Sequence, residues 1–152
     1  MLLYRIVEEA FARDMSGEGA RSYGGRWNPK GTPMIYTAES VALAALEVLV
    51  RLSTHKHYTR VIYDVPDTAS LETVLIADLP ANWLVPHPNT HLIEAGRRWA
   101  KEKRSLLLKT PSAVVLGEGW NYLINPLHPE FPAVTIRDVS PFNYDIRLTE
   151  NK

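Results

Sequence analysis

The segment that most constrains the fold lies at residues 41–52 and reads VALAALEVLVRL. It is apolar at every position except Glu47 and Arg51, which predicts a helix over Val41–Leu52, with Ser40 or Thr37 as its N-cap. A helix that is apolar nearly all round needs cover on more than one side. We therefore expect this helix to pack inside a folded domain, with one carboxylate in an apolar setting.

The rest of the chain predicts short strands and one further helix, at Thr90–Ser105. Runs rich in β-branched and aromatic residues predict the strands: Leu2–Val7, Pro33–Thr37, Arg60–Val65, Thr73–Ala77, Ala113–Leu116, Tyr122–Ile124 and Ala133–Asp138. Runs rich in glycine, proline and polar residues predict the loops: Arg13–Gly31, Pro80–Asn89 and Pro126–Pro132. No shift in composition marks a second domain, so we expect one mixed α/β or α+β domain over residues 1–152.

Composition narrows the class of protein. Hydrophobic residues make up 45% of the 152, and Lys+Arg and Asp+Glu both number 17. This balance argues against a dedicated nucleic-acid binder, although a local basic patch stays open. The chain has no cysteine, which removes disulfides, thiolate zinc sites and cysteine nucleophiles. Its beginning shows no signal peptide, and its longest apolar run, Val41–Leu46, is far shorter than the ~20 residues of a membrane span. We expect a cytoplasmic protein.

A glycine-rich segment from Tyr23 to Pro29 places Arg26 and Trp27 beside two glycines. Glycine lets a ligand approach the main chain, and the guanidinium fork of arginine matches phosphate oxygens. The segment could therefore clamp a diphosphate, with Trp27 walling a pocket for a flat ring. The plain alternative is a surface turn with a core-facing tryptophan. No P-loop and no GxGxxG pattern is present.

Glu47, Tyr36 and Ser112 are further candidates. A carboxylate in an apolar helix is costly unless it is paired or used. Glu47 either forms an ion pair with Arg51 towards solvent or lies at a pocket edge, where it stabilises positive charge on a sugar or holds a ribose hydroxyl. Tyr36 either stacks on a ligand ring or is a half-buried strand residue. Ser112, at an expected strand start, either bonds a substrate or caps a turn, and no G-x-S-x-G elbow surrounds it.

The five histidines do not form a metal motif. His87 and His91 are four residues apart, but prolines interrupt the helix that would align them, and no H-E-x-x-H occurs. We therefore expect no metal site.

These candidates belong to short strings that follow one another along the chain: Leu3-Tyr4-Arg5-Ile6, Gly24-Gly25-Arg26-Trp27-Asn28, Ile35-Tyr36-Thr37-Ala38, Ala45-Leu46-Glu47, Pro111-Ser112-Ala113-Val114-Val115, Asn121-Tyr122-Leu123-Ile124-Asn125-Pro126 and His128-Pro129. Together they resemble the RES domain, from the first residues to about Arg137. The Arg, Glu and Ser after which that family is named correspond here to Arg26, Glu47 and Ser112.

The resemblance implies a compact α+β domain similar to the ADP-ribosyltransferase fold, acting as the toxin of a type II toxin–antitoxin pair. It implies NAD⁺ as the substrate, with no prosthetic group. Arg26 and Tyr36 would hold NAD⁺, Trp27 would add a wall, Glu47 would serve the ribose, and Ser112 would be a further polar contact.

The implied partner is an Xre-like antitoxin with a helix-turn-helix, through which the complex would reach DNA. A homodimer within a larger complex fits this arrangement. The implied reaction is cleavage of the nicotinamide–ribose bond by water or phosphate. Two alternatives stay open: transfer of ADP-ribose to a cellular protein, and a non-catalytic partner-binding or RNA-targeting toxin.

Overall fold

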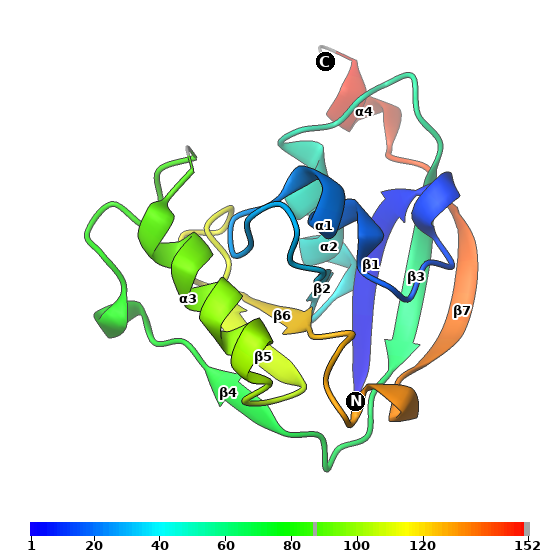
Figure 1. The fold of residues 1–152 in the computed structure, drawn as a ribbon. Coiled ribbons are helices and arrows are strands. Elements are labelled where there is room, and N and C mark those ends of the chain that lie inside the picture. Colours follow the sequence, from blue (N-terminus) through cyan, green and yellow to red (C-terminus); the bar gives the residue numbers. More distant parts are fainter. Residues whose placement is uncertain (87, 151–152) are drawn as a thin grey trace.

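The computed structural model describes residues 1–86 and 88–150 (Figure 1). His87, considered above as a metal ligand, lies outside the described residues, as do the last two residues of the expected domain.

Within the described part, the chain builds one seven-stranded sheet in the order β4-β5-β6-β2-β1-β3-β7. The strands are β1 (Leu2–Glu8), β2 (Ile35–Ala38), β3 (Tyr58–Asp64), β4 (Leu71–Thr73), β5 (Leu107–Pro111), β6 (Trp120–Ile124) and β7 (Thr135–Phe142). Neighbouring strands run antiparallel, except that β4 and β5 are parallel. The sheet and its helices confirm the α+β prediction.

The helices are α1 (Glu18–Tyr23), α2 (Val41–Leu49), α3 (Thr90–Glu102) and α4 (Ile146–Thr149), with 3-10 turns at Glu9–Phe11, Ile76–Asp78 and Phe131–Ala133. Of the two predicted N-caps of α2, Ser40 and Thr37, the structure selects Ser40, whose Oγ accepts a hydrogen bond from Leu43 N at 3.1 Å. The helix ends earlier than predicted, at Leu49.

Helices α2 and α3 cover one face of the sheet. Paired residues of neighbouring strands share a face, so Ala38 lies on the same side as its partner Asn121, and Leu108 on the same side as Leu123. Ala38 packs with buried residues of α2, whereas Leu108 and Leu123 pack with buried residues of α3. Helix α2 therefore lies over β1 and β2. Helix α3 lies over β5 and β6 (Figure 1).

One predicted strand was wrong. Ala113–Leu116 is not a strand but part of the turn from β5 to β6, closed by the hydrogen bond from Ser112 N to Gly119 O. Leu116 and Gly117 have φ angles of 56° and 87°, which no strand residue adopts. The strand is instead Leu107–Pro111, which was not predicted. The hairpin must reverse at this turn, and this requirement outweighs the strand propensity of Ala-Val-Val-Leu.

Other boundaries shifted. The strand expected at Thr73–Ala77 ends at Thr73 as β4, and residues 76–78 form a 3-10 turn. The loop expected at Arg13–Gly31 contains α1. Helix α3 ends at Glu102 rather than Ser105, because Lys103 takes a left-handed conformation with φ 51°. The last strand begins at Thr135 and runs to Phe142, past the predicted end.

Candidate active site

Helix α2 carries Glu47 to the edge of the covered face. Leu43, Ala44 and Val48 of the same helix are buried against the sheet and hold the helix in place. Glu47 is half-buried, and its side chain reaches the turn that follows β5 and the first residues of β6. The sequence alternative of an ion pair with Arg51 is not formed among the described residues.

Two neutral donors hold one oxygen of this carboxylate. Ser112 Oγ and Asn121 Nδ2 both donate to Glu47 Oε1, each at 2.6 Å. Within the described part of the chain, Oε2 accepts no hydrogen bond and no cationic side chain forms an ion pair with Glu47. The carboxylate is thus oriented by two donors while its charge stays unneutralised, and the second oxygen is left for another partner.

Two further polar atoms lie beside this cluster without a partner. Thr110 and Asn121 face each other across β5 and β6, on the side of the sheet that α2 and α3 cover. Thr110 Oγ1 and Asn121 Oδ1 are both buried and, among the described residues, have no hydrogen-bond partner. Unsatisfied buried polar atoms are rare in folded proteins and occur at catalytic sites among other places.

The predicted diphosphate clamp is a tight turn. Gly25 and Asn28 bridge each other, so Arg26 and Trp27 occupy the tip. Tyr36, on β2, accepts a hydrogen bond from Trp27 N at 3.0 Å and donates one to Asn28 Oδ1 at 2.6 Å. Burial raises the pKa of Tyr36, against the opposing effects of the Trp27 N–H and of the Arg51 and Arg26 charges, so this hydroxyl keeps its proton at neutral pH.

Arg26 is half-buried, and its Nη1 donates to the carbonyl oxygen of Trp83 at 2.7 Å. It lines a pocket of about 410 Å³ between this turn and the start of α3. Gly24, Gly25, Lys30 and Asn89 are among the other lining residues, and Glu47 is not. The arginine and the carboxylate therefore belong to two neighbouring groups of residues.

Strand β2 links the two groups. Tyr36 pairs with Leu123 and Ala38 with Asn121, so Tyr36 and Asn121 are diagonal neighbours on the same face. Tyr36 holds the Arg26 turn, while Asn121 holds Glu47. Both groups thus lie on the face that α2 and α3 cover, rather than on opposite sides of the molecule.

The remaining predicted residues have other surroundings. Trp27 is 2% exposed and packs in the core with Trp99, which favours the alternative of a core-facing tryptophan. Ser112 is fully buried and follows the end of β5 instead of starting a strand. Its hydroxyl is directed at Glu47. Sequence reasoning assigned no role to Asn28, Thr110 or Asn121. Asn28 and Asn121 did lie within the quoted strings, but nothing local showed which side chains they would meet.

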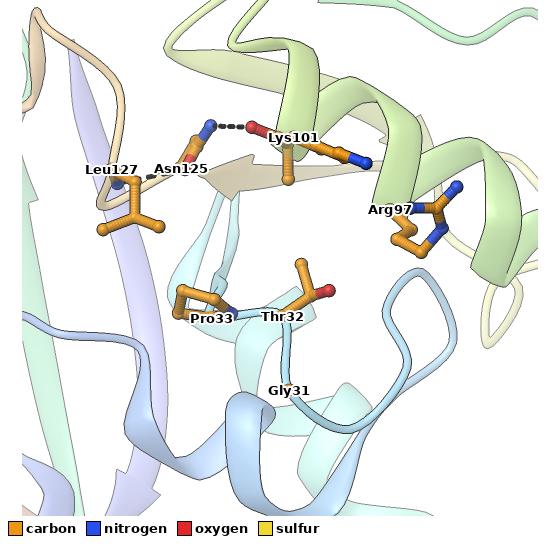
Figure 2. A pocket seen from close by; sticks show the side chains of 8 residues that line it. Gly31, Thr32, Pro33, Arg97, Lys101, Asn125 and Leu127 are labelled. Atoms are coloured by element: carbon orange, nitrogen blue, oxygen red, sulfur yellow. Dashed lines mark hydrogen bonds between the residues drawn. The ribbon is translucent and has the colours of Figure 1, made fainter.

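A second hollow is lined by a different set of residues. It has a volume of about 240 Å³, and Figure 2 shows Arg97 and Lys101 of α3 on one side of it and Thr32 and Pro33 on the other. In the described residues, no group of three or more His, Cys, Asp or Glu side chains could hold a metal ion. No helix there is long and apolar enough to cross a membrane.

Comparison with known proteins supplies the family. A family profile described as RES domain matches residues 2–146. A protein named Toxin Res from Photorhabdus laumondii is 35% identical, with 100% of this chain and 99% of that protein covered. A protein named Prs ADP-ribosylating toxin, from a Sphingobium species, is 38% identical over 95% of this chain and 94% of its own length.

A solved structure shares the fold. In the complex of the M. tuberculosis toxin MbcT with the antitoxin MbcA, a chain superposes with a TM-score of 0.72 and 23% identity. The alignment covers 98% of this chain and 87% of that one. This likeness shows that the two chains share one α+β fold. With the profile match over nearly its whole length, the chain belongs to the RES domain family.

Proposed function

We propose that this chain is the toxin of a toxin–antitoxin pair and that it cleaves the nicotinamide–ribose bond of NAD⁺, with residues 1–152 working as one domain. Arg26, Tyr36 and Glu47 would meet the substrate, and Ser112 and Asn121 would orient Glu47.

The observation that carries this proposal is the state of the Glu47 carboxylate. Its Oε1 accepts from two neutral donors, and in the described residues no cation pairs with it. Such a group is oriented in advance and gains most when positive charge develops nearby, as on the ribose ring when a glycosidic bond breaks. A cationic partner would already have neutralised the Glu47 carboxylate in the protein without substrate.

The other contacts fit the rest of a dinucleotide. Arg26 lines a pocket of about 410 Å³, within the range of ligand-binding pockets, and its guanidinium can meet a diphosphate. The ring of Tyr36, held at its hydroxyl end, would pack against the nicotinamide.

The proposed step is a displacement at the anomeric carbon of the nicotinamide ribose. The carbon–nitrogen bond breaks and its electron pair leaves with nicotinamide, which departs neutral. A water oxygen then bonds to the same carbon and loses a proton. The products are ADP-ribose, nicotinamide and one proton. With phosphate as the nucleophile, ADP-ribose-1″-phosphate would form instead.

A second candidate uses the same site with a different acceptor. The Sphingobium relative carries the name of an ADP-ribosylating toxin, and a protein side chain could take the place of water. Labelled NAD⁺ separates the two reactions, because free ADP-ribose indicates degradation and protein-bound label indicates transfer.

The test measures NAD⁺ loss by purified protein, for the wild type and for Glu47→Gln. We expect the variant to fold and to lose at least ~100-fold in kcat, because one charge-directed contact contributes about 2.7–4 kcal/mol to a transition state. Glu39→Gln is the matched control, since Glu39 is exposed just before α2 and accepts one hydrogen bond, from Trp120 N. Full activity of a folded Glu47→Gln would refute the role of Glu47. A wild type that leaves NAD⁺ intact and labels no protein would favour a non-catalytic or RNA-targeting toxin.

The proposed partner is an antitoxin. The M. tuberculosis neighbour is part of a toxin–antitoxin complex, and we extend that arrangement to this chain, with an Xre-like helix-turn-helix protein that contacts DNA. A homodimer inside the complex belongs to the same proposal. The partner should suppress NAD⁺ loss in the assay above.

A further inference from the structure

The turn that carries Arg26 is held from several sides. Gly25 N donates to Asn28 O at 2.9 Å, which closes the turn. The side chain of Asn28 is 1% exposed, and its Nδ2 donates to three carbonyl oxygens, those of Ala20, Pro29 and Thr32. One buried amide thus ties the turn to α1 and to the loop that leads into β2.

The Tyr36 hydroxyl completes this arrangement. It donates to Asn28 Oδ1 and accepts from Trp27 N, so both polar functions of the hydroxyl are directed at the turn. Tyr36 comes from the sheet, whereas Asn28 is part of the turn itself. Trp27 packs against Leu108 and Leu123 of the sheet, and among the described residues the Tyr36 oxygen supplies the hydrogen bonds between the sheet and the turn.

The close packing leaves little freedom. A Cβ atom at Gly25 would lie 2.7 Å from the Tyr36 hydroxyl oxygen, and one at Gly96 of α3 would lie 1.8 Å from the Trp27 carbonyl oxygen. The turn is thus pressed between β2 and α3, with Arg26 at its tip.

We propose that the Tyr36 hydroxyl and the Asn28 amide are positioning residues, which hold the Arg26 turn in the geometry that binds the diphosphate of the substrate. This inference rests on the proposed function. In a merely structural role the two residues would affect stability alone. In a positioning role, loss of the hydroxyl lets the turn move and displaces the guanidinium, while the aromatic ring of residue 36 stays in place.

Tyr36→Phe tests this directly, because it removes only the hydroxyl. We expect the KM for NAD⁺ to rise roughly tenfold with kcat within about twofold, because a displaced guanidinium weakens the binding of the substrate and of the transition state equally. The amide hydrogen of Trp27 should exchange faster with solvent once its acceptor is gone. An unchanged KM in a folded variant would overturn the proposal.

Tyr58→Phe is the matched control. The Tyr58 hydroxyl also accepts a backbone hydrogen bond, from Ser53 N at 3.1 Å, outside the Arg26 turn. We expect a similar loss of stability with an unchanged KM. An equal rise in KM for both variants would show that lost stability alone explains the effect, and would overturn the proposal.

Gly25→Ala is a second, independent variant, because its methyl group would push against the Tyr36 hydroxyl. It should also raise the KM and speed exchange of the Trp27 amide. If the wild type fails to consume NAD⁺, the proposed function falls. If the wild type consumes NAD⁺ while both variants keep its KM, only the positioning role falls.

Discussion

At the scale of single residues, the hydrogen-bond partners of Ser112 and Glu47 indicate their roles better than their residue types do. The sequence left Ser112 open between a substrate contact and a turn cap, and in the structure its fully buried hydroxyl donates to Glu47 Oε1. Glu47 was left open between an ion pair and a site carboxylate, and its two neutral donors favour the second. This hydrogen bond favours a role in which the serine orients the carboxylate.

Ser112→Ala distinguishes the two roles of this serine. A lost hydrogen bond to a charged group is worth about 1.5–3 kcal/mol, so we expect kcat to fall roughly 10- to 100-fold with little change in KM. A direct substrate contact would instead raise the KM. Ser105→Ala is the matched control in steady-state kinetics, since Ser105 is also buried and bonds Trp99 Nε1 and Leu107 O. A variant with a raised KM and an unchanged kcat would contradict the orienting role.

At the scale of elements, helix α3 packs directly on the backbone of the Arg26 turn. Gly96 makes this approach possible, because the Trp27 carbonyl oxygen occupies the space that a Cβ atom at residue 96 would need. Helix propensity alone would favour alanine at this position. The contact with the turn therefore outweighs the local preference of the helix.

Gly96→Ala should lower the melting temperature despite alanine's better helix propensity. Overpacking costs about 1–3 kcal/mol, or roughly 2–12 °C for a chain of this size. Gly19→Ala in α1 is the control, because a Cβ there would lie 3.9 Å from Phe11 Cδ1, an ordinary contact. That variant should be neutral or stabilised in thermal denaturation. A Gly96→Ala variant that is also stabilised would show that the turn yields easily.

At the scale of the whole molecule, the strand order assembles the candidate site. Strand β6 lies between β2 and β5, so residues far apart in sequence become neighbours; the bond from Thr37 Oγ1 to Tyr122 O spans 85 positions. Glu130 connects the loop before β7 to the residue before β4, because its carboxylate accepts hydrogen bonds from Ser70 N and Ser70 Oγ. Ser70 Oγ in turn accepts from Leu106 N, which ties this corner to the start of β5.

This corner predicts a dependence of stability on pH. The hydrogen bond from the Ser70 side chain, and then that from its backbone, lower the pKa of Glu130. A carboxyl with a lowered pKa in the folded state stabilises above its unfolded value, near 4.5, and loses that contribution as the pH falls through the folded value. Glu130→Gln should therefore show a shallower loss of stability below about pH 4.5 in denaturant titrations. Glu118→Gln, at an exposed carboxyl, is the control for the loss of one charge, and an unaltered slope for Glu130→Gln would contradict the assignment.

Local pattern by itself determined the strongly periodic elements and the candidate residues. The apolar stretch that begins at Val41, its Ser40 cap, and the alternation of Leu2–Val7 and Arg60–Val65 were predictable, because propensity, capping and burial agree there. Arg26 and Glu47 could be named because an arginine among glycines and an acid in an apolar helix are conspicuous against their neighbours.

Only the tertiary structure decided which of these residues meet. The β5–β6 reversal turned an apparent strand at Ala113–Leu116 into a turn, and the pairing of β6 with both β2 and β5 brought Asn121 to Glu47 and Thr110 to Asn121. Strand pairing and helix packing depend on contacts between distant segments, and a local pattern carries no information about those contacts. For the same reason, the roles of Asn28 and Asn121 became visible only once the sheet had placed them.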